Sequence, residues 1–122
     1  MSMNITTHKR LEDYMLAKPG AKLDYPFGEQ AAVYKVNGKM FALIAEKKEP
    51  VNISLKCDPL LAKHLREKYV EVQPGYHLNK KHWNTVVATG QLSEQEIMDL
   101  INHSYDLVVA GMTADEQDKL KQ

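Results

Sequence analysis

The sequence has little cysteine, no long apolar run and no net charge. Cys57 is the single cysteine among 122 residues, so no intrachain disulfide can form, and we expect a reducing compartment. No stretch approaches the ~20 apolar residues of a membrane-spanning helix. Residues 1–15 lack the apolar run of a signal peptide. These absences predict a cytoplasmic protein without a membrane partner.

Familiar catalytic and metal-binding motifs are absent as well. The sequence contains no phosphate-binding glycine loop, no G-x-S-x-G and no H-E-x-x-H. Cys57 would need a base such as His64 or His77 to act as a nucleophile, and a small apolar side chain at a strand end is its simpler role. His77 and His82 have no Cys or carboxylate at zinc-finger spacing. We therefore expect no catalytic residue, no metal and no cofactor, and an enzyme ranks last among three functional hypotheses.

The sequence does contain enough apolar residues for one core. Hydrophobic residues make up 43% of the chain, and a chain of this size buries roughly two-thirds of its unfolded surface. Neither a metal nor a disulfide is needed to hold such a core together. We predict a single domain over residues 1–122, and a monomer.

Charge is unevenly distributed along the chain although it sums to zero. Residues 1–90 carry 14 Lys and Arg against 9 Asp and Glu, whereas residues 91–122 carry 2 against 7. A dipolar chain of this kind can present one basic face to a partner. The alternative is an ordinary solvated surface whose last helices happen to be acidic.

Three predicted strands form a β-meander, and a further strand follows later. Residues 32–36 and 39–44 flank Asn37-Gly38, the dipeptide of a type I′ hairpin turn. Residues 51–55 alternate apolar and polar side chains, as a strand with one buried face should. Residues 85–88 are a largely β-branched run that predicts the further strand.

Capping signals predict four helices. Their expected N-caps are Thr7, Asp58, Ser93 and Thr113. Apolar residues of the second helix recur every four positions and should face the sheet, namely Leu61, Leu65 and Tyr69. The third helix has a predicted core stripe of Ile97, Leu100, Ile101, Tyr105 and Val108.

The predicted element order is α-β-β-β-α-β-α-α. Residues 21–29 are expected to be an extended or looped entry, and residues 70–75 a turn containing Pro-Gly. The order predicts an α+β fold, in which a mostly antiparallel sheet packs against helices on one face.

Residues 74–85, PGYHLNKKHWNT, have an unusual composition. They hold the only Trp of the chain, two of its five His, two adjacent Lys and two Asn. Hydrogen-bonding side chains that alternate with aromatic rings and lie beside positive charge suit a phosphate-bearing partner. Trp83 and Tyr76 could instead pack against the sheet, and Asn79 or Asn84 could form a turn with its own backbone.

Three segments together resemble the MmcQ/YjbR family: Lys18-Pro19-Gly20-Ala21, Ile53-Ser54-Leu55-Lys56 before Asp58-Pro59, and the motif from Pro74 to Val86. The resemblance covers nearly the whole chain. It implies a compact α+β fold similar to the bacterial frataxin homologue, and a DNA-binding protein with paired β-hairpin-like wings. It implies no catalytic residues. The acidic ridge with which frataxins bind iron is not evident, since the first helix holds only Glu12 and Asp13.

We predict a non-catalytic DNA-binding protein that contacts phosphates through the basic hairpin and residues 74–83. The predicted contact residues are Lys35, Lys39, Tyr76, His77, Asn79, Lys80, Lys81, His82 and Asn84. The lysines would bind phosphates, and the His and Asn side chains would hydrogen-bond phosphates or base edges. The alternative is a module for a protein partner or a small ligand that uses the same His, Trp and Lys surface.

Overall fold

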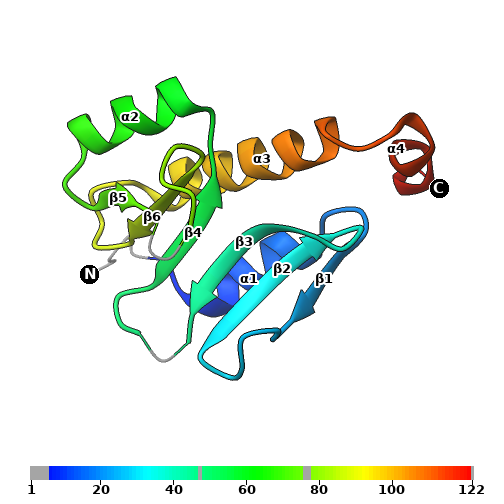
Figure 1. The fold of residues 1–122 in the computed structure, drawn as a ribbon. Coiled ribbons are helices and arrows are strands. Elements are labelled where there is room, and N and C mark those ends of the chain that lie inside the picture. The colour runs from blue at the N-terminus through cyan, green and yellow to red at the C-terminus, as the bar shows by residue number, and fades with distance from the viewer. Residues whose placement is uncertain (1–5, 47, 76–77, 122) are drawn as a thin grey trace.

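The computed structural model describes residues 6–46, 48–75 and 78–121. In these residues it has four helices and six strands (Figure 1). In chain order they are α1 (His8–Leu16), β1 (Ala21–Asp24), β2 (Ala31–Val36), β3 (Lys39–Ala45), β4 (Asn52–Lys56), α2 (Pro59–Lys68), β5 (Val72–Pro74), β6 (Trp83–Val87), α3 (Glu94–Ala110) and α4 (Ala114–Leu120). The predicted α+β class and element order are confirmed, and two short strands, β1 and β5, are added.

The six strands form one sheet in the order β1-β2-β3-β4-β6-β5, and every neighbouring pair is antiparallel. The two added strands are its edges. β5 lies in a segment that the sequence predicts as a turn, because three residues ending at Pro74 carry too little pattern to indicate a strand. Short edges, one of them ending in proline, leave few unpaired backbone groups for another chain to pair with.

The hairpin between β2 and β3 forms as predicted. Asn37 and Gly38 have φ values of 51° and 78°, the left-handed conformation that a type I′ turn requires at both central residues. A β-bulge between Tyr34 and Lys35 precedes the turn. Bulges increase the local twist of a hairpin, and Figure 1 shows this one reaching toward α4.

All four predicted N-caps are confirmed. The Thr7, Asp58, Ser93 and Thr113 side chains each accept a backbone N–H from the first turn of the helix that follows. The caps of α3 and α4 are complete capping boxes. In each, the side chain of the glutamate three residues after the cap accepts the backbone N–H of the cap residue.

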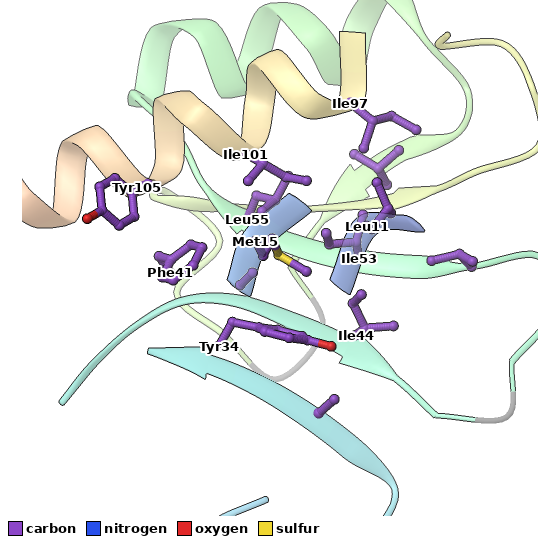
Figure 2. Close-up of a cluster of buried hydrophobic side chains, with 14 of the residues drawn as sticks. Leu11, Met15, Tyr34, Phe41, Ile44, Ile53, Leu55, Ile97, Ile101 and Tyr105 are labelled. Carbon is purple, nitrogen blue, oxygen red and sulfur yellow. The ribbon is translucent and has the colours of Figure 1, made fainter. Parts of the chain in front are cut away.

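The core lies between the sheet and the helices α1 and α3. Leu11 and Met15 of α1 and the predicted stripe of α3 point at the strands (Figure 2). Phe41 of β3 meets Tyr105 of α3 edge to face, with ring centroids 5.3 Å apart. The stripe of α2 is less buried than predicted: Leu65 and Tyr69 pack against the core only in part, and Ala62 alone is fully buried.

The two faces of the sheet differ because side chains alternate along a strand. The face toward the helices carries Ala32, Tyr34, Ala42, Ile44, Ile53, Leu55 and Val86, all members of the core. Within the described ranges, no helix covers the opposite face, which we call the uncovered face. None of the helices described is long and apolar enough to cross a membrane.

Candidate nucleic-acid interface

Three lysines form an interrupted row on the uncovered face, in which β3 contributes Met40 between the lysines of β2 and β4. Strand register pairs Lys22 of β1 with Lys35 of β2, and Lys56 of β4 with Trp83 of β6. Val33 and Ser54 on this face are buried, whereas the three lysines and Trp83 keep exposed surface. The accessible part of the face therefore includes three cations together with the partly exposed apolar side chains of Met40, Leu43 and Val87.

One carboxylate opposes this row among the described strand residues. Asp24 of β1 lies 3.0 Å from the Lys35 ammonium, measured from Oδ2 to Nζ. The hydrogen bond from Lys35, helped by the Tyr25 backbone N–H, lowers the pKa of Asp24. Lys35 is thus already paired with a carboxylate. Lys22 and Lys56 form no ion pair among the described residues.

Acidic residues gather instead on the helical side of the sheet. α3 contains four Asp and Glu and no Lys or Arg, and α4 contains three against one Lys. α3 packs on the covered face against β2, β3 and β4. The charge asymmetry of the sequence therefore becomes in part a separation in space: α3 and α4 are acidic and three strand lysines lie on the uncovered face, but α2 on the helical side is basic.

The loop of residues 78–82 holds two more exposed lysines, Lys80 and Lys81. The Asn79 side chain accepts the Lys81 backbone N–H at 2.9 Å, and the Asn79 carbonyl accepts the His82 N–H at 3.2 Å. The Cys57 N–H donates to the His82 carbonyl at 2.7 Å. Asn79 is therefore a turn former, one of the two roles predicted for it, and it holds the backbone so that both lysines project into solvent.

Arg66 of α2 is a neighbour of this loop that sequence reasoning missed. Its Nη1 donates to the Lys80 carbonyl at 3.1 Å. α2 also carries Lys63 and Lys68, against the single carboxylate Glu67. The density of cations in this helix is visible in the sequence, but its position beside the loop depends on the packing of α2 on β5 and β6.

The structure separates the hairpin lysine Lys39 from the loop lysines. Lys39 lies beside α4, close enough for its charge to act on Glu116 of that helix. The pKa of Glu116 is lowered mainly by the hydrogen bond from the Thr113 backbone, and the charge of Lys39 lowers it further. The Asn37 side chain donates to Glu116 at the same place. Lys80 lies instead beside α2, and Figure 1 shows α2 and α4 at opposite ends of α3.

Asn84 must be removed from the predicted contact residues. It is 3% exposed, and its Nδ2 donates to the Ala62 carbonyl of α2 at 3.2 Å. Its side chain points to the covered face because it alternates with Trp83 and Thr85 along β6. His82 and Trp83 are partly exposed, while Tyr76 and His77 lie outside the described residues.

Cys57 is poorly suited to be a nucleophile. Its side chain is 4% exposed, and burial, with a smaller contribution from Asp58, raises the pKa of the thiol to about 11. A thiol with this pKa holds only on the order of one thiolate in ten thousand at neutral pH. This residue gives no support to the enzyme hypothesis.

Fold and surface together define the class: an α+β protein whose antiparallel sheet has the acidic helix α3 on one face and strand lysines on the other. The sequence model of a family described as YjbR matches residues 16–107. The chain belongs to the YjbR family.

Relatives in Escherichia coli extend over almost the whole chain. The uncharacterised protein YbdF of strain O157:H7 is 37% identical over 114 residues, covering 93% of both chains. The uncharacterised protein YjbR of strain K12 is 37% identical over 114 residues, covering 93% of this chain and 96% of the relative. Neither name describes an enzyme or a ligand.

Solved structures with the same fold come from two other bacteria. A crystal structure of a Deinococcus radiodurans protein superposes with a TM-score of 0.91 at 32% identity, covering 99% of this chain and 92% of that one. A crystal structure of a Pseudomonas syringae protein gives a TM-score of 0.72 at 34% identity, covering 84% and 98%. These likenesses support the arrangement of strands and helices described above.

Proposed function

We propose that this protein binds DNA through a surface that we call the basic face. It consists of Lys22, Lys35, Lys56, Lys80, Lys81 and Trp83. The observation that carries the proposal is the distribution of charge: strand lysines lie on the uncovered face, two more lysines lie in the loop before β6, and α3 and α4 are acidic. A surface of one sign attracts an oppositely charged polymer even when the net charge of the protein is zero.

Lys80 and Lys81 are the principal phosphate contacts in this proposal. Both side chains are exposed, and the backbone that bears them is bonded to Asn79, Cys57 and Arg66. A prearranged loop loses little conformational entropy on binding. Ordering the loop therefore offsets less of the favourable electrostatic free energy. Lys56 and Lys22 would extend the phosphate track across the sheet, and His82 would donate a hydrogen bond beside it.

Salt dependence of binding tests the proposal. Each neutralised phosphate of duplex DNA contributes a slope of about −0.9 in a plot of log K against log salt concentration. Replacing Lys80 and Lys81 with Ala should therefore make the slope shallower by about 2 units, since two phosphate contacts are removed. Fluorescence anisotropy of a labelled duplex, titrated at several salt concentrations, gives the slope.

A matched control is present at the other end of the molecule. Lys119 and Lys121 lie in and just after α4, and both are exposed. Their double Ala variant changes the net charge by the same amount but should leave the slope within error of the wild type. Equal slopes for the two double variants would show a general charge effect and refute the assigned surface. Absence of binding to any DNA at low salt would refute the function itself.

A protein partner is the second candidate, and a specific observation favours it. Leu60 at the start of α2 is 81% exposed, and Val70 just after its end is 86% exposed. Two bare apolar side chains at the ends of one basic helix are suited to anchoring a partner. Nuclease-resistant capture of one protein by the wild type, lost in a Leu60→Ser and Val70→Ser variant, would support this role. Capture that persists in the variant would exclude this helix as the docking site.

A further inference from the structure

Trp83 is the first residue of β6, and its backbone and Cβ pack closely against Gly75. The Gly75 N–H donates to the Trp83 carbonyl at 2.9 Å. A Cβ at Gly75 would lie 2.8 Å from the Trp83 Cβ, 3.1 Å from the Trp83 carbonyl oxygen and 3.3 Å from the Leu78 Cβ. Glycine is therefore required here by the close approach of Trp83, and the base of the indole side chain packs directly on the backbone of residue 75.

Lysines lie near Trp83 both across the sheet and along the chain. Lys56 is its cross-strand partner on β4, and directly opposed side chains have Cβ atoms about 4.5–5.5 Å apart. Lys80 and Lys81 precede Trp83 in the loop. Beyond it along the sheet, the Ser54 and Thr85 hydroxyls bond to each other at 2.8 Å. A partly exposed aromatic residue thus has one cation opposite it on β4 and two more in the loop that leads into β6.

Rings and cations arranged in this way favour single strands over duplexes. The faces of the bases are stacked inside a duplex and cannot reach an aromatic side chain, whereas an unpaired base can stack on it while the lysines hold the adjacent phosphates. Phosphate contacts alone would not require an indole. The indole therefore distinguishes this surface from a purely electrostatic track.

We propose that the basic face takes single-stranded DNA, with one base stacked on Trp83 and the neighbouring phosphates at Lys56 and at Lys80 and Lys81. This inference rests on the proposed function and specifies its substrate class. The track from β1 to β6 crosses four inter-strand spacings, about 19 Å at about 4.8 Å each. Binding without base-specific hydrogen bonds gives little sequence preference.

The wild-type protein carries its own probe for this site. Trp83 is the only Trp in the chain, so intrinsic tryptophan fluorescence reports on this ring alone. Titration with an oligothymidylate of about 12 nucleotides should quench the emission because a base stacks on the indole. An oligonucleotide of equal length made of abasic sites has the same phosphates and no bases. It should bind about 5- to 150-fold more weakly and leave the emission unchanged.

Two variants separate stacking from charge. Trp83→Phe keeps a smaller aromatic ring and should retain most of the preference for oligothymidylate over the abasic strand, measured by anisotropy of labelled strands. Trp83→Leu should abolish that preference and leave the salt slope unchanged, because no cation is removed. Thermal unfolding checks that each variant is folded. If Trp83→Leu does not fold, the wild-type quenching and the abasic comparison decide the question.

The outcomes distinguish this inference from the function on which it rests. Tighter binding of oligothymidylate than of duplex, with quenching, supports both. Equal binding of duplex, abasic strand and oligothymidylate without quenching would overturn the single-strand inference and leave DNA binding intact. Failure to bind any of the three at low salt would overturn the proposed function.

Discussion

The two faces of the sheet are built from the same strands and serve different ends. On β4, Ile53 and Leu55 enter the core, while Ser54 and Lys56 lie on the uncovered face. Alternation alone assigns neighbouring residues to opposite faces. The covered face is almost entirely apolar because its positions pack against the helices α1, α2 and α3. The uncovered face packs against no helix among the described residues and admits lysines, although Val33 and Ser54 on it are buried.

Asn84 is the exception on the covered face, and it helps to explain the position of α2. Its amide donates to the Ala62 carbonyl, so this polar side chain links β6 to a helix that has only one fully buried residue. A buried polar group needs a hydrogen-bond partner: the Asn84 Nδ2 has one in α2, whereas its Oδ1 is buried without one among the described residues.

The largest expected contrast between the faces comes from two adjacent residues of β3. Ile44→Ala should lower the free energy of unfolding by about 2–4 kcal/mol, because Ile44 is 1% exposed in the core and its loss leaves a cavity. Leu43→Ala, on the uncovered face and only partly buried, should cost about 1 kcal/mol. Chemical denaturation gives both values. Equal losses would mean that the uncovered face is packed like the other.

A buried carboxylate offers the next largest effect. Glu71 is 4% exposed and accepts bonds from the Thr89 N–H and hydroxyl and from the Gln91 and Leu92 N–H groups. In Glu71→Gln an NH₂ group replaces one of the accepting oxygens and cannot accept the N–H groups that face it. We therefore expect the free energy of unfolding to fall by about 2 kcal/mol. The control is Glu67→Gln on the exposed side of α2. Its free energy of unfolding should stay within about 0.5 kcal/mol of the wild-type value. A Glu71→Gln protein as stable as the control would contradict this role.

A smaller effect, dependent on pH, is expected where α1 meets α3. Hydrogen bonds from Arg10 and then from Thr6 lower the pKa of Glu94 from 4.5 to about 2. Because the folded-state pKa is depressed, this stabilisation is present above about pH 4.5 and is lost as the pH falls toward 2. Glu94→Gln should cost at most about 1 kcal/mol at pH 7, since solvent screens the pair.

Unfolding curves of the wild type and Glu94→Gln, recorded between pH 7 and pH 2, test this expectation. The two stabilities should converge on the acid side. The exposed pair of Lys9 and Asp13, 2.9 Å apart on α1 alone, supplies a control in Asp13→Asn. A difference between wild type and Glu94→Gln that stays constant over the whole range would show that the effect is not electrostatic.

The smallest effect on stability is expected on the uncovered face, where function should be most sensitive. Lys56→Gln should change the free energy of unfolding by no more than about 0.5 kcal/mol. In the DNA assay it should reduce the salt slope by about 0.9, because one phosphate contact is lost. Lys39→Gln, beside α4, is the matched control and should leave the slope unchanged. The reverse pattern would move the interface to the hairpin tip.

Much of the fold could be predicted because its signals are local. The Asn37-Gly38 turn, the four N-caps and the stripe of α3 each depend on residues close in sequence. β5 could not be predicted, because it is three residues long and exists only by pairing with β6. Sequence analysis also found the loop lysines Lys80 and Lys81, since exposure of adjacent lysines needs no knowledge of the fold.

The arrangement of the site was decided by contacts that no local pattern encodes. The sequence alone determined the family, the order of the helices and the four longer strands, and the excess of lysine before residue 90. Tertiary structure decided that Asn84 is buried, that Arg66 lies beside Lys80, that Lys39 belongs to the α4 side, and that Lys56 lies across from Trp83. Local preferences act over a few residues, whereas strand register and helix packing join residues far apart in the chain, so only the folded sheet could place these side chains relative to one another.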